Sequence, residues 1–185
     1  MNKRFKTAIG LWLVGCTMWA QQKPSIRYKG MVEVGYSVGV GDTRLNRLEL
    51  STTQGCLFGS HWYVGAGVGL HRYTEDDKYF LNSMIGIPFY GNVRYYATVG
   101  NTNLFGSFKA GYTFSDIKGF YAVPEIGCRF SIGGRQNLCV SAGYTLQQNT
   151  FYYSREVTIQ PDGSIYLEPH KKNMGAITFK LGYEF

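Results

Sequence analysis

Residues 175–185 alternate strictly between two kinds of side chain. One parity is wholly apolar and consists of Ile177, Phe179, Leu181, Tyr183 and Phe185. The other parity is small or polar and consists of Ala176, Thr178, Lys180, Gly182 and Glu184. Because successive side chains of a β-strand point to opposite faces, this pattern predicts a strand that separates two very different environments.

The same division recurs upstream, between clusters of Gly, Asn, Asp and Ser. Four stretches alternate well: 32–40, 62–71, 107–114 and 138–147. Three more alternate less cleanly: 45–58, 80–96 and 120–132. The 24 Gly and 15 Tyr also favour short strands and turns, and residues 28–185 carry no helical pattern. We therefore predict eight strands, each long enough for the ~9–11 residues that cross a bilayer at a tilt.

The two sets of alternating side chains suit different solvents. The apolar parity is bulky and nearly uncharged, as a lipid-facing surface must be, because Lys or Arg there costs about 2–4 kcal/mol at the bilayer midplane. The other parity is rich in Gly, Ser and Thr and carries charges of both signs, namely Glu33, Glu49, Arg94, Lys109, Glu125, Arg129 and Lys180. We expect the four cations of this set to be neutralised by its three carboxylates inside a narrow lumen. The fold predicted is all-β: an eight-stranded antiparallel up-and-down transmembrane β-barrel, closed because hydrocarbon leaves no backbone group unpaired.

The amino terminus has the form of a secretory signal. Basic residues at 3, 4 and 6 precede an apolar run over 8–14 that is too short to span a bilayer as a helix. We expect a signal peptide over residues 1–20, cleaved after Ala20, and then a short periplasmic segment over 21–27. The alternative is a lipoprotein box that ends at Cys16 and leaves that residue acylated.

The formal charge of +7 raises the possibility of nucleic-acid binding. Three of these charges, however, lie in the predicted signal peptide, and the others are scattered singly among acids. Without a basic stripe or a recognition helix, we expect no nucleic-acid partner.

The connections between strands differ at the two ends of the predicted barrel. If the chain enters from the periplasm, the connections on that side are brief, at 59–60, 100–102 and 133–136, whereas the outer side carries the long segment 148–173. This asymmetry is typical of outer-membrane barrels. It also predicts two aromatic girdles, one with Phe58, Trp62, Tyr95, Phe130, Tyr183 and Phe185, and the other with Tyr112, Phe114, Phe120 and Tyr144.

The long outer segment contains a hairpin pattern of its own. Short β-prone stretches flank Asp162-Gly163, which is a favoured two-residue turn. We predict that a hairpin over about 150–172 protrudes from the membrane. One hypothesis is that its edge and its tyrosines (Tyr152, Tyr153 and Tyr166) bind an extracellular partner. The alternative is a rigid surface loop.

With these features together, the chain resembles the outer membrane protein β-barrel domain family, small barrels of the OmpA/OmpX type. The resemblance is carried by the segments 63–70, 88–96, 110–114 and 177–185. It implies a place in the bacterial outer membrane. The terminal pattern of Phe179, Leu181, Tyr183 and Phe185 is similar to the signal by which the barrel-assembly machinery recognises its clients. We expect no peptidoglycan-binding domain after Phe185, and hence not the tethering role of larger relatives.

Little in the sequence suggests catalysis or metal binding. Cys128 and Cys139 flank a turn, but their parities differ, so we expect free, buried thiols there and at Cys56 rather than a disulfide. A zinc site is not expected, because paired Cys or His spacings are lacking. His71 is expected near the outer rim, in contact with Glu75. No serine is coupled to a base.

We expect a monomeric, non-enzymatic membrane protein without cofactor or metal. Its role would be at the cell surface, in envelope integrity or in binding a ligand or partner through extracellular loops, with outer-membrane lipid around it. Two alternatives remain: a narrow passive channel, and a lipid-modifying enzyme that acts at the rim.

Overall fold

The computed structural model describes residues 25–41, 45–75, 84–100, 102–159 and 165–185. The side chains of Glu75 and of residues 149–172 are outside that description. Several predictions therefore concern parts of the chain that are not described: the signal peptide with its alternatives at Ala20 and Cys16, the start of the fourth strand, the hairpin tip at Asp162-Gly163, and the hairpin tyrosines.

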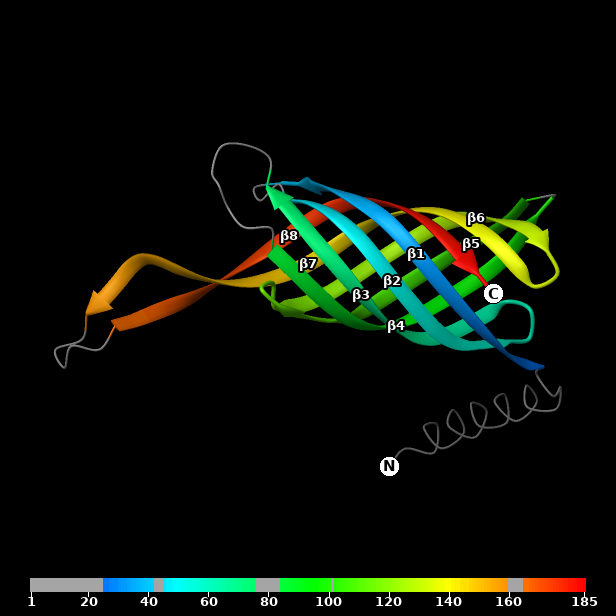
Figure 1. Ribbon diagram of the computed structural model, residues 1–185, viewed down its shortest axis with the longest axis horizontal. Coiled ribbons are helices and arrows are strands. Elements are labelled where there is room, and N and C mark those ends of the chain that lie inside the picture. Colours follow the sequence, from blue (N-terminus) through cyan, green and yellow to red (C-terminus); the bar gives the residue numbers. More distant parts are fainter. Residues whose placement is uncertain (1–24, 42–44, 76–83, 101, 160–164) are drawn as a thin grey trace, which may run out of the picture.

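The described chain forms one closed barrel in which each strand pairs antiparallel with its neighbours in sequence and β8 pairs with β1 (Figure 1). The strands are β1 (Ile26–Val40), β2 (Leu45–Phe58), β3 (Trp62–Glu75), β4 (Met84–Val99), β5 (Thr102–Ser115), β6 (Gly119–Gly133), β7 (Gln136–Ile159) and β8 (Ile165–Glu184). This confirms the predicted fold class.

The strands are staggered around the barrel. Following directly paired residues once around the ladder gives the path Arg27, Leu57, Tyr63, Arg94, Ser107, Glu125, Gly143, Thr178, Ser37. The path therefore returns to β1 ten residues further along, from Arg27 to Ser37. For eight strands this stagger corresponds to a tilt of about 40° and an interior just wide enough for side chains to fill.

The outward face is predominantly apolar on every strand. Val34, Leu50 and Leu181 are representative, with 45%, 52% and 47% of their surface exposed. Aromatic side chains gather at both ends of this face: the rings of Trp62 and Tyr95 lie 4.9 Å apart, and those of Tyr112 and Phe114 lie 5.0 Å apart. The apolar parity therefore points away from the lumen, and the charged parity points into it.

Interior aromatic rings explain why two strands alternate less cleanly in sequence. Tyr90 and Tyr96 of β4 and Tyr121 of β6 are all at least 95% buried inside the barrel. Interior glycines make room for such rings. A Cβ atom at Gly127 would stand only 2.5 Å from the ring of Phe105. The glycine-rich parity is therefore part of how the lumen is packed.

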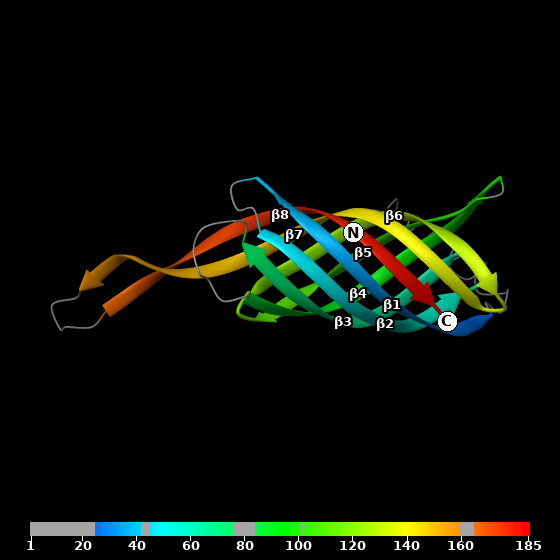
Figure 2. The ribbon, with the colours of Figure 1, turned by 45° about the horizontal axis from the view of Figure 1, so that its top comes forward.

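The two ends of the barrel differ. At one end, called the turn end, connections 59–61, 100–101 and 134–135 join the strands. At the other end β7 and β8 continue beyond the wall as a two-stranded ribbon, which projects well past the other strands (Figures 1 and 2). The pairing of β7 with β6 ends at Gln147, and that of β8 with β1 ends at Gly175.

The ribbon is defined as residues 148–159 and 165–174. Its backbone pairs from Gln148↔Asn173 to Ile159↔Ile165, with an irregularity between Tyr152 and Val157. The hairpin predicted over about 150–172 falls within this ribbon, and its tip is outside the described residues. Beyond the barrel wall, each ribbon strand is paired along one edge with the other ribbon strand. No described strand pairs with its other edge.

The three described cysteines are free. Cys128 pairs directly with Val140, and Cys139 pairs with Arg129, so their side chains point to opposite faces as expected. The expectation that all three thiols are buried is wrong for Cys56 and Cys128. Both lie on the outward parity and are partly exposed, whereas Cys139 is buried among interior side chains.

The outward face gives a direct test of which solvent it meets. Leu50→Lys, midway along β2, should destabilise the barrel in phospholipid vesicles by about 2–4 kcal/mol, because the ammonium group would enter hydrocarbon. Ile132→Lys, near the end of β6, should change the stability by about 0–1 kcal/mol. Reversible urea unfolding in vesicles measures both. Equal effects at the two positions would contradict the assignment.

Candidate functional site

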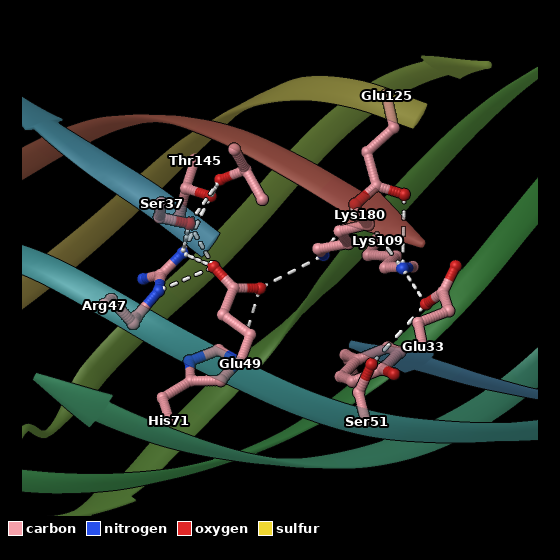
Figure 3. A network of polar contacts seen from close by, with 12 residues as sticks. Glu33, Ser37, Arg47, Glu49, Ser51, His71, Lys109, Glu125, Thr145 and Lys180 are labelled. Atoms are coloured by element: carbon pink, nitrogen blue, oxygen red, sulfur yellow. Dashed lines mark hydrogen bonds and ion pairs between the residues drawn. The ribbon is translucent and has the colours of Figure 1, made fainter. Parts of the chain in front are cut away.

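Charged side chains from six of the eight strands meet inside the barrel. Figure 3 shows the part of this cluster that runs from Arg47 to Glu33. Along the lumen the signs of the charges alternate, in the order Arg47, Glu49, Lys180, Glu125, Lys109, Glu33, Arg94, Glu184 and Lys29. We call this series the ion chain. None of its side chains is more than 9% exposed.

One half of the ion chain lies toward the ribbon. Arg47 Nη2 stands 2.5 Å from Glu49 Oε1, and Lys180 Nζ stands 3.2 Å from the other oxygen of Glu49. Lys180 Nζ is also 2.6 Å from Glu125 Oε1. Glu49 therefore has a cation on each side, and so does Glu125, whose second cation is Lys109. Pairing of this kind is the condition under which a buried charge is tolerated.

The other half runs toward the turn end. Lys109 bridges Glu125, at 3.2 Å, and Glu33. Arg94 then uses both terminal nitrogens, one 2.9 Å from Glu33 and the other 2.8 Å from Glu184. Lys29 ends the chain, with its Nζ 2.5 Å from Glu184 Oε2. The planar guanidinium of Arg94 suits such a two-sided contact.

Hydroxyl groups complete the coordination of these charges. Ser37 donates a hydrogen bond to Glu49, and Arg47 Nη2 donates to Thr145 Oγ1 at 2.9 Å. Ser107 donates to Glu125 at 3.0 Å, and Tyr96 Oη donates to Glu184 at 2.7 Å. Bonds of this kind, in which one partner is charged, are stronger than neutral ones.

Apolar clusters lie at both ends of the ion chain. Toward the ribbon the cluster contains Leu45, Tyr73, Ile117 and Met174. At the turn end it contains Met31, Tyr63, Tyr96, Phe105 and Cys139. Charges and clusters together fill the lumen with side chains. The arrangement can neutralise charge and cross-link strands, and nothing in it pairs a nucleophile with a base.

The structure brings together six of the seven interior residues predicted from sequence: Glu33, Glu49, Arg94, Lys109, Glu125 and Lys180. Arg129 differs. It lies near the turn end with its guanidinium 4.6 Å from the centre of the Tyr96 ring, and no described carboxylate stands within ion-pair distance of it. The expectation that a neighbouring glutamate neutralises Arg129 is therefore wrong.

Sequence reasoning missed Lys29, Arg47 and Glu184 as members of the ion chain. All three lie on the polar parity of their strands, so the alternation itself could have identified them. What it could not supply was the register that places Glu184 between Arg94 and Lys29.

His71 also corrects an expectation. It is 1% exposed inside the barrel, where its Nε2 lies 3.7 Å from Glu49 Oε2, rather than at the outer rim. Direct pairing of Glu49 with His71 between β2 and β3 places His71 in the interior. The side chain of its expected partner, Glu75, is outside the description. Among the described residues, no group of three or more His, Cys, Asp or Glu side chains could hold a metal ion. No helix among them has the length and apolar character to cross a membrane.

Solved structures provide a comparison for the whole barrel. Neisserial surface protein A (NspA) aligns with a TM-score of 0.54 at 7% identity, over 86% of this chain and 97% of that one. The chain thus has the fold of a small outer-membrane β-barrel. The likeness concerns the fold alone, because the identity is so low.

Two further structures align over most of their length, but their TM-scores are too low to support a conclusion about this fold. A de novo designed protein, TMB2.3, gives 0.40 at 14% identity over 89% of this chain and 96% of that one. The translocator domain of the autotransporter NalP from Neisseria meningitidis gives 0.28 at 10% identity over 97% of each. No protein-family model and no curated protein matches the chain.

The ion chain can be tested at its centre. Glu33→Gln removes the carboxylate that Lys109 and Arg94 share, and leaves two buried cations with one partner each. We expect a loss of about 3–5 kcal/mol in the free energy of unfolding, measured in vesicles.

The double variant Glu33→Gln/Lys109→Met serves as the control, because it removes a cation together with the anion. It should be less destabilised than the sum of its single variants by about 1 kcal/mol or more. Additive effects would contradict direct coupling between these two residues.

Proposed function

We propose that the protein is an integral protein of the bacterial outer membrane, without enzymatic activity, that acts at the cell surface or in envelope integrity. One observation carries the proposal: the outward face is predominantly apolar on every strand, while all charges of the ion chain are buried in the lumen. A barrel of this kind is soluble in lipid, and water would be a poor solvent for it. The fold similarity to an outer-membrane barrel supports the same location.

The orientation follows from the two ends. Outer-membrane barrels have short turns on the periplasmic side and longer loops outside. The turn end is therefore assigned to the periplasm and the ribbon to the extracellular side. The terminal pattern of Phe179, Leu181, Tyr183 and Phe185 supports insertion by the barrel-assembly machinery, as does the resemblance to OmpA/OmpX-type barrels. We propose that the protein works as a monomer surrounded by outer-membrane lipid.

The interior favours this role over the two alternatives. A passive channel needs a continuous path for water, whereas the ion chain and the two apolar clusters occupy the lumen. A rim enzyme needs a nucleophile and a base in contact. Contrary to the expectation that no serine is coupled to a base, Ser60 and His61 share a hydrogen bond of 2.8 Å in a turn, and the His61 ring stacks on that of Tyr95. Among the described residues, however, no carboxylate pairs with His61 to complete a catalytic arrangement.

Heat-modifiability of the membrane-extracted protein tests the location and the closed fold together. The folded barrel should be found in the outer-membrane fraction, need detergent for extraction, and migrate differently on a gel before and after boiling. Recovery as a folded monomer in plain buffer would overturn the proposal.

The ribbon is the part of this surface that we propose to contact a partner. Among the described strands, its two strands pair only with each other beyond the wall, so each has an edge of backbone N–H and C=O groups to which no described strand is paired. Unpaired edges accept an extended segment from another chain as an additional strand. The partner class proposed is thus an extended peptide segment, recognised through its main chain.

Deleting residues 155–168 tests this role. The deletion preserves the pair Tyr152↔Pro169 and leaves a two-residue connection, so the barrel should still fold and show heat-modifiability. A matched control replaces the same residues with a Gly/Ser segment of equal length, which keeps the loop but not the strands.

Binding of expressing cells to an array of extended peptides is the readout. Cells with the native ribbon should bind, and both variants should lose binding. Equal binding by native and deletion cells would identify the ribbon as a rigid surface loop only.

A further inference from the structure

The mouth of the lumen at the turn end is a polar pocket of about 220 Å³. It lies just beyond the last member of the ion chain, Lys29. Its lining is Arg27, Tyr28, Lys29, Leu57, Arg129, Gly134, Arg135, Asn137 and Phe185. Four of these side chains are cationic, and none is a carboxylate.

Three of the four cations have no counterion. Lys29 pairs with Glu184, but Arg27, Arg129 and Arg135 form no ion pair with any described residue. In the ion chain, by contrast, every cation contacts at least one carboxylate. Positive charge is therefore in excess at this mouth, and the described residues supply no ion-pair partner for these three guanidinium groups.

The Arg129 guanidinium is held in place by a neighbouring ring and still has a hydrogen-bond donor that no described residue uses. It stacks on the Tyr96 ring at 4.6 Å, which restricts its orientation. Its Nε is buried and has no hydrogen-bond acceptor among the described residues. A buried donor without an acceptor costs free energy, and a bound anion would supply that acceptor. Arg135 stands in the adjoining turn, with its backbone oxygen accepting a hydrogen bond of 3.2 Å from Asn137.

We propose that this mouth is a binding site for a phosphate-like oxyanion. Arg guanidinium groups match the planar array of oxygens on such a group through paired hydrogen bonds. Two sources share this chemistry: a free phosphate or phosphomonoester in the periplasm, and the phosphate of a lipid headgroup at the rim. Tyr28 and Phe185 line the pocket and are also exposed on the outside of the barrel, which places the site beside the lipid boundary.

The test compares two double variants with the same change in charge. Arg129→Gln/Arg135→Gln removes two cations from the mouth that take part in no ion pair. Arg72→Gln/Lys118→Gln removes two exposed cations at the ribbon end. Heat-modifiability confirms that each barrel is closed. If the mouth variant fails to fold, Arg135→Gln alone replaces it, because that residue lies in a turn.

Two arms distinguish the sources. The first titrates glycerol phosphate and inorganic phosphate into protein in a zwitterionic detergent at constant ionic strength, followed by phosphorus NMR. The second reconstitutes the protein in nanodiscs with either phosphatidylglycerol or phosphatidylcholine and measures the bound anionic lipid by native mass spectrometry.

We expect binding by the native protein and by the ribbon-end variant, and binding roughly tenfold or more weaker in the mouth variant. Saturation in the first arm identifies a free phosphate compound, and selective retention of phosphatidylglycerol in the second identifies a lipid headgroup. Absence of binding in both arms, or equal loss in both double variants, would overturn the proposal.

Discussion

The lumen of this barrel has to hold charges in a space with little room for water. With eight strands and a stagger of ten residues, the interior is only as wide as the side chains that fill it. An isolated charge there would cost several kcal/mol. The ion chain meets this constraint by alternation: each of its four carboxylates contacts two cations. The ion chain thus lets a barrel with an apolar outward face hold these charges in its interior.

The sequence alone was sufficient for the architecture, because alternation reports directly on a strand with two solvents. The parity of Leu181 and Lys180 already separates the outward face from the lumen, and the structure agrees. Parity gives the face of a side chain but not its depth along the barrel or its partner in the next strand. Arg129 was placed on the right parity, yet it sits at the mouth, where no carboxylate reaches it.

Register is the information that the pattern lacked. Glu49 and His71 are direct partners between β2 and β3, which moves His71 from the expected rim into the interior. At the observed stagger, rings fit against interior glycines and charges pair with charges, and both kinds of contact join residues far apart in sequence. Phe105 against Gly127 is one such fit. These long-range contacts leave no local signature that a single sequence reveals.

The ion chain also bears on how the barrel assembles. Lys180 and Glu184 both belong to the last strand, and their partners come from β1, β2, β4 and β6. A sheet of seven strands would leave Glu49, Arg94 and Lys29 without a contact that β8 supplies. An intermediate in which β8 has not yet paired with β1 would thus keep a hydrated groove. Water would leave the interior when these two strands pair. The ion chain is therefore complete only when the carboxyl-terminal strand has closed the barrel.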